Sequence, residues 1–184
     1  MAAATYFRDQ VARIETSCHP SKETVAPPEY RHYWCSSVIF AVLAMEANAY
    51  DLMTAISRGE STPGRALRLE DLGKPLLDRY ALLYQVATRG KVFRHGKGIA
   101  HAAGALLIAL RDEIQYSKTE LRSAKVSRKL EASLRARFTL CPFRCEDVFF
   151  YDQCASASSA EWAVETSHNF IAQFARATGY RLNV

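Results

Sequence analysis

Two residues of opposite charge interrupt apolar helical segments, and their positions suggest that they meet. Glu46 lies within the apolar face of "SSVIFAVLAMEANAYDLM", and Arg111 follows Leu107 by four residues in "LLIALRDEIQYSK". A carboxylate on an apolar face needs a partner, a proton or a polar cleft, and an arginine fork is a natural partner. We therefore expect Glu46 and Arg111 to meet across a helical bundle. Such a pair can form part of a site or can only fix the register of two helices, and the sequence leaves both interpretations open.

The elements that must position this pair are predicted to be helices, because the apolar residues recur at steps of three and four. The predicted helices span about 4–16, 29–58, 74–87, 100–121, 127–138 and 155–178. A short strand is predicted within "DVFFY", residues 147–151. The expected fold class is all-α, an antiparallel helical bundle of about five to six helices. We expect one domain over residues 1–184, in which 1–28 form a peripheral N-terminal helix and loop.

Each long helix offers one stripe for the core. In the second helix the stripe comprises Ile39, Val42, Leu43, Ala49, Tyr50, Met53 and Ile56. In the fourth it comprises Leu107, Leu110, Ile114 and Leu121. In the last it comprises Trp162, Thr166, Phe170, Ile171 and Phe174. Glu46 falls within the stripe of the second helix.

Composition points to an ordinary globular chain of 184 residues with a net charge of +5. The apolar run before Glu46 covers about ten residues, where a membrane span needs roughly 20. We find no signal-peptide pattern, so we expect a cytoplasmic protein without a membrane partner. Five scattered cysteines favour reduced thiols. Cys141, Cys145 and Cys154 lack the spacing of known metal ligands, so we predict no metal and no cofactor.

In pattern and order, the chain from about Tyr33 to Gly179 resembles bacterial HEPN-type helical proteins. The resemblance rests on "SSVIFAVLAMEANAYDLM", then "LLIALRDEIQYSK", then "CASASSAEWAVETSHNFIAQF". In that family a helix with an inward glutamate precedes one reading roughly Leu-x-x-Leu-Arg-Asn-x-x-x-His-Tyr-Lys. A final helix with a Trp-Ala pair and an aromatic stripe closes the bundle. The resemblance implies a homodimer, and many members are metal-independent ribonucleases of toxin–antitoxin or antiphage systems.

The family's arginine, the polar residue after it and the histidine fall on one helix here, and the inward glutamate falls on an earlier one. The family arginine falls on Arg111, the polar residue after it on Asp112, and the family histidine on Tyr116, while Glu46 takes the place of the inward glutamate. Metal-free RNA cleavage needs a base and an acid that titrate near neutrality, as histidine does. A tyrosine, with an ordinary pKa of about 10, is a poor base at pH 7. We therefore expect ribonuclease activity to be weak or lost.

Two other arginine–histidine pairs could replace the missing histidine. Arg89 with His95, and Arg94 with His101, have a similar spacing but span a glycine-rich loop rather than a helix. His101 is the better candidate because it opens the helix that carries Arg111. It nevertheless lies about 15 Å from Arg111 along the helix axis.

Basic side chains around the fourth and fifth helices could follow an RNA backbone. The predicted RNA-binding residues are Arg89, Lys91, Arg94, Lys97, Lys118, Arg122, Lys125 and Arg128. The alternative is a solvated helix face, which is the more usual role of basic runs.

Three functions remain open. The first is a HEPN-like protein linked to RNA or to a defence or toxin–antitoxin system, with ribonuclease activity weak or lost. The second is an active metal-independent endoribonuclease toxin that uses a non-standard base. The third is a non-catalytic helical interaction or regulatory subunit, whose partner would be another protein of such an operon.

Overall fold

The computed structural model describes residues 1–21, 23–57, 69–89, 99–116, 128–144 and 150–180, and these are helical with connecting turns. The elements are α1 (Ala2–Cys18), α2 (Pro28–Ser57), the 3-10 helix η1 (Leu69–Gly73), α3 (Leu76–Ala87), α4 (Ile99–Tyr116), α5 (Arg128–Arg135), α6 (Phe150–Gln153) and α7 (Ala157–Thr178). Within these ranges there is no strand, and Val25 and Arg144 form an isolated parallel bridge. The all-α prediction is confirmed.

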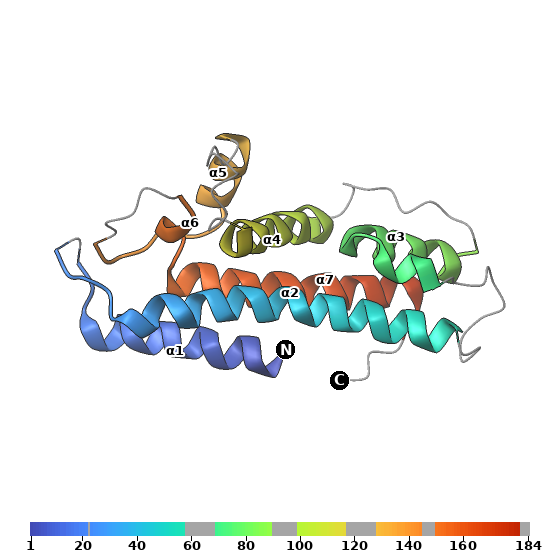
Figure 1. Cartoon of the computed structure of the whole chain (residues 1–184), viewed down its shortest axis with the longest axis horizontal. Helices are drawn as coiled ribbons and strands as arrows, with labels where there is room; N and C mark the ends of the chain where they lie inside the picture. The colour runs from blue at the N-terminus through green and yellow to red at the C-terminus, as the bar shows by residue number, and fades with distance from the viewer. Residues whose placement is uncertain (22, 58–68, 90–98, 117–127, 145–149, 181–184) are drawn as a thin grey trace.

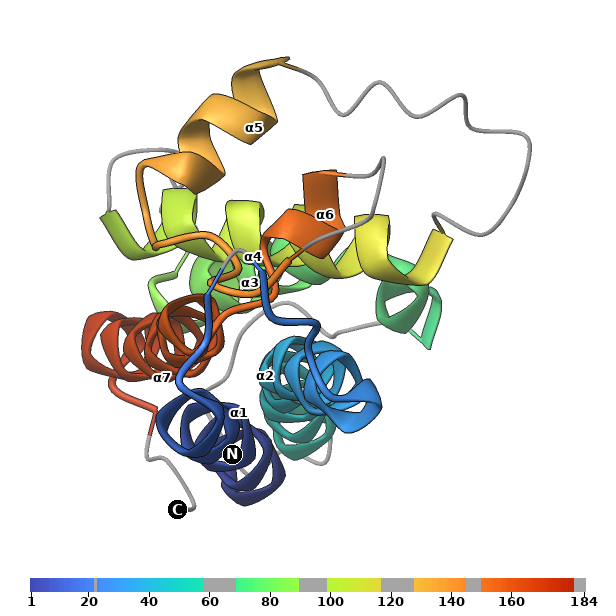
Figure 2. The same cartoon turned by 90° about the vertical axis from the view of Figure 1, so that its left-hand side faces the viewer.

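Three long helices, α1, α2 and α7, pack side by side, and α3 and α4 lie across α2 and α7 (Figures 1 and 2). α5 and α6 sit beyond α4, away from α1. The bundle is only partly antiparallel. Hydrogen bonds join Trp34 to Ser159 and Ala41 to Ser167, at sequence separations of 125 and 126, so α2 and α7 run in the same direction. The expectation of an antiparallel bundle is therefore wrong for this pair of helices.

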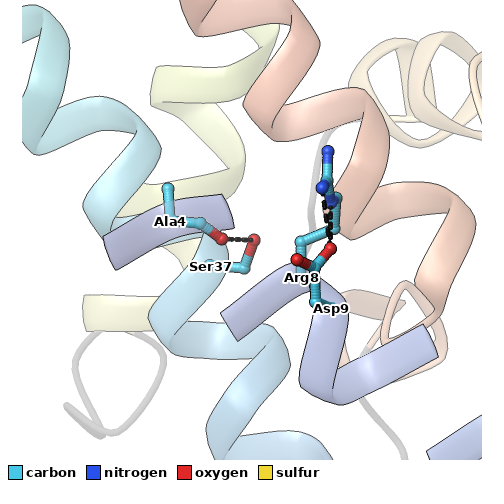
Figure 3. A network of polar contacts seen from close by, with 4 residues as sticks. All are labelled: Ala4, Arg8, Asp9 and Ser37. Atoms are coloured by element: carbon cyan, nitrogen blue, oxygen red, sulfur yellow. Dashed lines mark hydrogen bonds and ion pairs between the residues drawn. The ribbon is translucent and has the colours of Figure 1, made fainter. Parts of the chain in front are cut away.

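Small residues bring α1 close to α2 (Figure 3). Ala4 and Ser37 are fully buried, and the Ser37 hydroxyl donates a hydrogen bond of 3.3 Å to the Ala4 carbonyl. Arg8 and Asp9 pair with each other on α1, at 2.7 Å between Nη2 and Oδ1. Val11 is also fully buried, so the N-terminal helix that the sequence suggested as peripheral contributes to the core.

α2 buries a different stripe from the one that its sequence suggests. Its buried residues are Tyr30, Trp34, Ser37, Val38, Ala41, Val42, Met45, Ala49, Met53 and Ile56. Leu43 and Tyr50, which were expected in the core, are 41% and 53% exposed. Apolar residues surround this helix on most sides, so periodicity alone selects the wrong face at these two positions.

α2 is also long and apolar enough, by length and composition alone, to cross a membrane, contrary to the sequence expectation. Core helices pass the same test, and ten residues of α2 are buried in the bundle.

α4 and α7 follow the predicted faces. Leu107 and Leu110 are buried, and Ile114 packs partly buried against the core. In the predicted α7 stripe, Trp162 is partly buried and the other members are buried: Thr166, Phe170, Ile171 and Phe174. Leu121 lies outside the described residues.

The predicted strand at residues 147–151 is wrong where the structure describes it, because Phe150 and Tyr151 begin α6. The Arg135 guanidinium lies 4.8 Å from the centre of the Phe150 ring, and Arg31 forms an ion pair with the buried Asp152. These contacts to α5 and α2 hold the segment as a helical turn, although aromatic and β-branched runs usually favour strands.

Candidate functional site

The predicted contact between Glu46 and Arg111 is present. Arg111 Nη1 donates to Glu46 Oε1 at 3.2 Å and so joins α4 to α2. The Arg111 side chain is 13% exposed and that of Glu46 29% exposed. Leu107 and Leu110 point α4 into the core, which leaves Arg111 at the edge of that stripe and facing α2.

Asp112 is the third member of this cluster. Its Oδ1 accepts a hydrogen bond of 2.8 Å from Arg111 Nε, and its side chain is 43% exposed. The guanidinium therefore binds one carboxylate on the neighbouring helix and one on its own helix. We call Glu46, Arg111 and Asp112 the arginine cluster.

The arginine cluster contains one cationic and two anionic groups, so its formal charge at neutral pH is −1. Two nitrogen atoms of Arg111 are already engaged by carboxylates. A guanidinium in this state attracts a phosphate far less than an unpaired one does, because the carboxylates repel the anion and compete for the same N–H donors. The geometry therefore suits a clamp between helices better than a phosphate site.

Tyr116, which the resemblance aligns with the family histidine, is the last residue of α4, five residues after Arg111. His101 lies near the other end of α4, and its ring centre is 6.5 Å from that of Phe170 on α7. The structure therefore does not bring His101 to the arginine cluster. Arg94 and His95, which form the other halves of the alternative pairs, lie outside the described residues.

Two of the eight predicted RNA-binding residues are described. Arg89 is exposed just after α3, and Arg128 is exposed at the start of α5. The other six, Lys91, Arg94, Lys97, Lys118, Arg122 and Lys125, lie outside the described residues. Lys129 in α5 and Arg137 just after it are also exposed and add positive charge near Arg128 in the sequence.

The cysteines do not gather into a metal site in the described part of the chain. Cys141 and Cys154 are buried, and Cys145 is outside the described residues. Among the residues that are described, no group of three or more His, Cys, Asp or Glu side chains could hold a metal ion. Burial raises the pKa of the Cys154 thiol to about 12, and this thiol donates to the Phe150 carbonyl.

A second polar cluster, which the sequence did not reveal, joins α1, α2 and α7. Glu15 Oε1 accepts a hydrogen bond of 2.5 Å from the Tyr30 hydroxyl and one of 2.7 Å from the backbone N–H of Ala157. Ser156 and Ser159 form a capping box at the start of α7, and Trp34 Nε1 donates to Ser159 Oγ at 2.7 Å. The available signal was the capping pattern at Ser156, because caps favour serine followed by a polar residue at the third helical position.

A third feature is a set of exposed aromatic side chains along α1 and α2. The Phe7 ring stacks on Tyr33 and on Phe40, at 6.1 and 5.5 Å between ring centres. Tyr6 lies edge-on to Phe7 at 5.3 Å and is 56% exposed. Phe40 is 39% exposed. Aromatic rings usually bury most of their area, so Tyr6 and Phe40 are unusually exposed for their type.

The chain matches no protein-family model, no curated protein and no solved structure. The residues and their geometry therefore carry the functional argument.

Proposed function

We propose that this chain is a HEPN-like helical protein that acts by binding a partner rather than by cleaving RNA. The arginine cluster supports this proposal, because Arg111 is held by Glu46 and Asp112 and only 13% of its side chain is exposed. In this proposal the cluster fastens α4 to α2 and shapes a surface of an interaction or regulatory subunit. Its setting would be a defence or toxin–antitoxin system, as the resemblance implies.

Catalysis by the family mechanism would need a group that exchanges a proton near neutral pH. The residue five positions after Arg111 is Tyr116, and a phenol does so poorly at that pH. His101, the best-placed substitute in the sequence, packs towards Phe170 at the far end of α4. Both observations favour binding over ribonuclease activity.

The test is RNA cleavage by the purified protein in the presence of a chelator. We expect no cleavage above that of a mock preparation, and we expect Arg111→Ala to lower stability without changing that background. If the protein cleaves RNA and Arg111→Ala abolishes cleavage while the fold is retained, the active ribonuclease is the correct function.

A Tyr116→His variant separates the family resemblance from the loss of catalysis. Cleavage that appears in this variant, and disappears again in Tyr116→His combined with Arg111→Ala, would indicate a HEPN-type arrangement that lacks only its base. A Tyr116→Phe variant is the matched control, since it supplies no titratable group.

RNA binding without cleavage is a second candidate, favoured by the exposed basic side chains. Arg128, Lys129 and Arg137 are exposed in and after α5, and none forms an ion pair within the described part of the chain. Binding of single-stranded RNA should then weaken steeply with salt, and Arg128→Glu with Lys129→Glu should weaken it further and reduce the salt dependence. Replacing Arg8, which pairs with Asp9 on α1, should have no effect.

A further inference from the structure

Two buried cysteines lie next to each other where the loop after α5 meets the junction of α6 and α7. Cys141 is 5% exposed and Cys154 is fully buried, and both are thiols in the structure. The backbone N–H of Cys141 donates a hydrogen bond of 2.7 Å to the carbonyl of Gln153, the residue before Cys154. The two cysteines therefore flank one hydrogen bond, although they belong to different segments of the chain.

This hydrogen bond limits the distance between the two Cα atoms. The Gln153 oxygen and the Cα of Cys154 belong to one planar trans peptide unit and lie about 2.8 Å apart, and the nitrogen of Cys141 is about 1.5 Å from its own Cα. The two Cα atoms thus lie at most about 7 Å apart, and about 5–6 Å apart with ordinary hydrogen-bond angles. Disulfides connect Cα atoms about 4.4–6.8 Å apart, so the backbone already has the spacing that this bond needs.

We infer that Cys141 and Cys154 are a redox pair, which hydrogen peroxide closes as a disulfide that fixes α5 to the start of α7. The reduced pair is the resting state, and the disulfide is the oxidised state. The inference is independent of the proposed function, because it concerns a part of the molecule that does not contact the arginine cluster.

The reaction needs only the two thiols and the peroxide. The Cys141 thiolate attacks one peroxide oxygen, so that an S–O bond forms, the O–O bond breaks and hydroxide leaves. The Cys154 thiolate then attacks the sulfur of this sulfenic acid, so that the S–S bond forms, the S–O bond breaks and a second hydroxide leaves. The two thiol protons neutralise the two hydroxides, and the peroxide is reduced to two molecules of water.

Burial sets the order and the rate of these steps. Cys141 retains some exposure, so its sulfur is the one that peroxide reaches first. Burial raises the pKa of the Cys154 thiol to about 12, and the Arg135 guanidinium nearby offsets part of this rise. Closing the disulfide also breaks the weak hydrogen bond from Cys154 Sγ to the Phe150 carbonyl. Because the thiolate is the reactive form, the disulfide should form slowly, under lasting rather than brief exposure to peroxide.

The disulfide would add a covalent bond to a junction that side-chain contacts hold. Arg135 of α5 donates to Gln153 at 3.1 Å and lies 4.8 Å from the centre of the Phe150 ring. Ser156, the N-cap of α7, donates to the Thr139 carbonyl at 2.6 Å. α5 lies beyond α4 (Figure 2), so this junction sets the orientation of α5 and of its exposed basic side chains.

The test is peptide mapping of the full chain after exposure to hydrogen peroxide, alkylation of the remaining thiols and digestion without reduction. Trypsin cleaves after Arg137 and Arg144, which leaves Cys141 as the one cysteine of its peptide. Chymotrypsin cleaves at the aromatic residues between Cys145 and Cys154, which separates these two. We expect a disulfide between Cys141 and Cys154. Cys145→Ser is the matched control and should retain it, whereas Cys154→Ala should abolish it.

The oxidised chain should also be more stable. A disulfide that closes a loop of about 14 residues restricts the unfolded chain, so we expect the Tm of the oxidised wild type to exceed that of the reduced wild type by about 5–10 °C. Peroxide should not raise the Tm of Cys154→Ala. Hydrogen exchange of the α5 amides should slow in the oxidised wild type and not in that variant.

A disulfide between Cys141 and Cys145 overturns the pairing, as does sulfinic acid at Cys141 with Cys154 still alkylated. A wild type in which both thiols remain alkylated after prolonged exposure overturns it as well. A disulfide between Cys141 and Cys154 that changes neither the Tm nor the exchange of α5 overturns the role of the pair in fixing that helix.

Discussion

The arginine cluster makes a quantitative prediction about stability. If Arg111 serves mainly to fasten α4 to α2, its interaction with Glu46 should appear as a coupling free energy between the two side chains. A double-mutant cycle with Glu46→Gln, Arg111→Met and the combined variant isolates that quantity. Met keeps much of the apolar stem of arginine, and Gln keeps the shape of glutamate, so each change removes charge with little loss of packing.

The structure sets the expected size of the coupling. At 3.2 Å, opposite unit charges attract by about 1.3 kcal/mol at the dielectric constant of water and by about 5 kcal/mol at an effective value of 20. Side-chain exposures of 13% and 29% place this pair between those limits, and partial desolvation and ordering offset part of the attraction. We expect a net coupling of about 1–2 kcal/mol.

The assay is urea unfolding followed by far-UV circular dichroism, with the fluorescence of Trp34 and Trp162 as a second probe. The matched control is the pair Arg135 and Glu131 on α5, four residues apart at 2.9 Å, with side chains 42% and 36% exposed. Exposed helix pairs of this kind contribute about 0.3–0.5 kcal/mol. A coupling free energy between Glu46 and Arg111 no larger than that of the control pair would refute the proposal that Arg111 mainly fastens α4 to α2.

Three further predictions concern the core. Gly104→Ala should lower the free energy of unfolding by about 1–2 kcal/mol, because the added Cβ would lie 2.9 Å from the ring of Phe170 on α7, and the better helix propensity of alanine offsets only part of that cost. Gly73→Ala is the control and should not lower it, because nothing lies within 4 Å of the added Cβ. Tyr80→Phe should cost about 1–2 kcal/mol in urea unfolding, because the buried hydroxyl shares its one proton between the Met45 carbonyl and Asn48 Oδ1 on α2, whereas Tyr50→Phe should be neutral. Burial raises the pKa of Cys154 to about 12, so the folded thiol keeps a proton that the unfolded chain releases near pH 9, and the free energy of unfolding falls as pH rises above 9. Cys154→Ala should reduce that fall by about 1.4 kcal/mol per pH unit, and an unchanged slope would contradict this assignment.

The sequence predicted the helices well where periodicity and chain breakers agree. Pro27 and Pro28 mark the start of α2 within a residue or two, and Gly179 follows the end of α7 in the left-handed conformation that glycine adopts readily. It failed at Leu43 and Tyr50 because a helix that is apolar on several sides has no single periodic face. It failed at Phe150 and Tyr151 because tertiary contacts outweigh the strand preference of an aromatic run.

The candidate site was predictable in part. A carboxylate at position 46 needs a partner, and Arg111 lies at the edge of the stripe that faces it, so their contact follows from local pattern and electrostatics. The cluster around Glu15 and Tyr30 did not follow, because it depends on which helix ends meet in three dimensions. The direction of α7 relative to α2 was hidden for the same reason.

The bond from Glu15 to the backbone of Ala157 also bears on how the chain is made. The two residues are 142 positions apart, so the first helix emerges from the ribosome long before the helix start that its carboxylate completes. Until then the apolar side of α1 and the buried face of α2 have no α7 to cover them. Closing such a long loop late makes folding slow and exposes apolar surface meanwhile. Truncation before residue 157 should therefore yield a chain that depends on chaperones and aggregates without them.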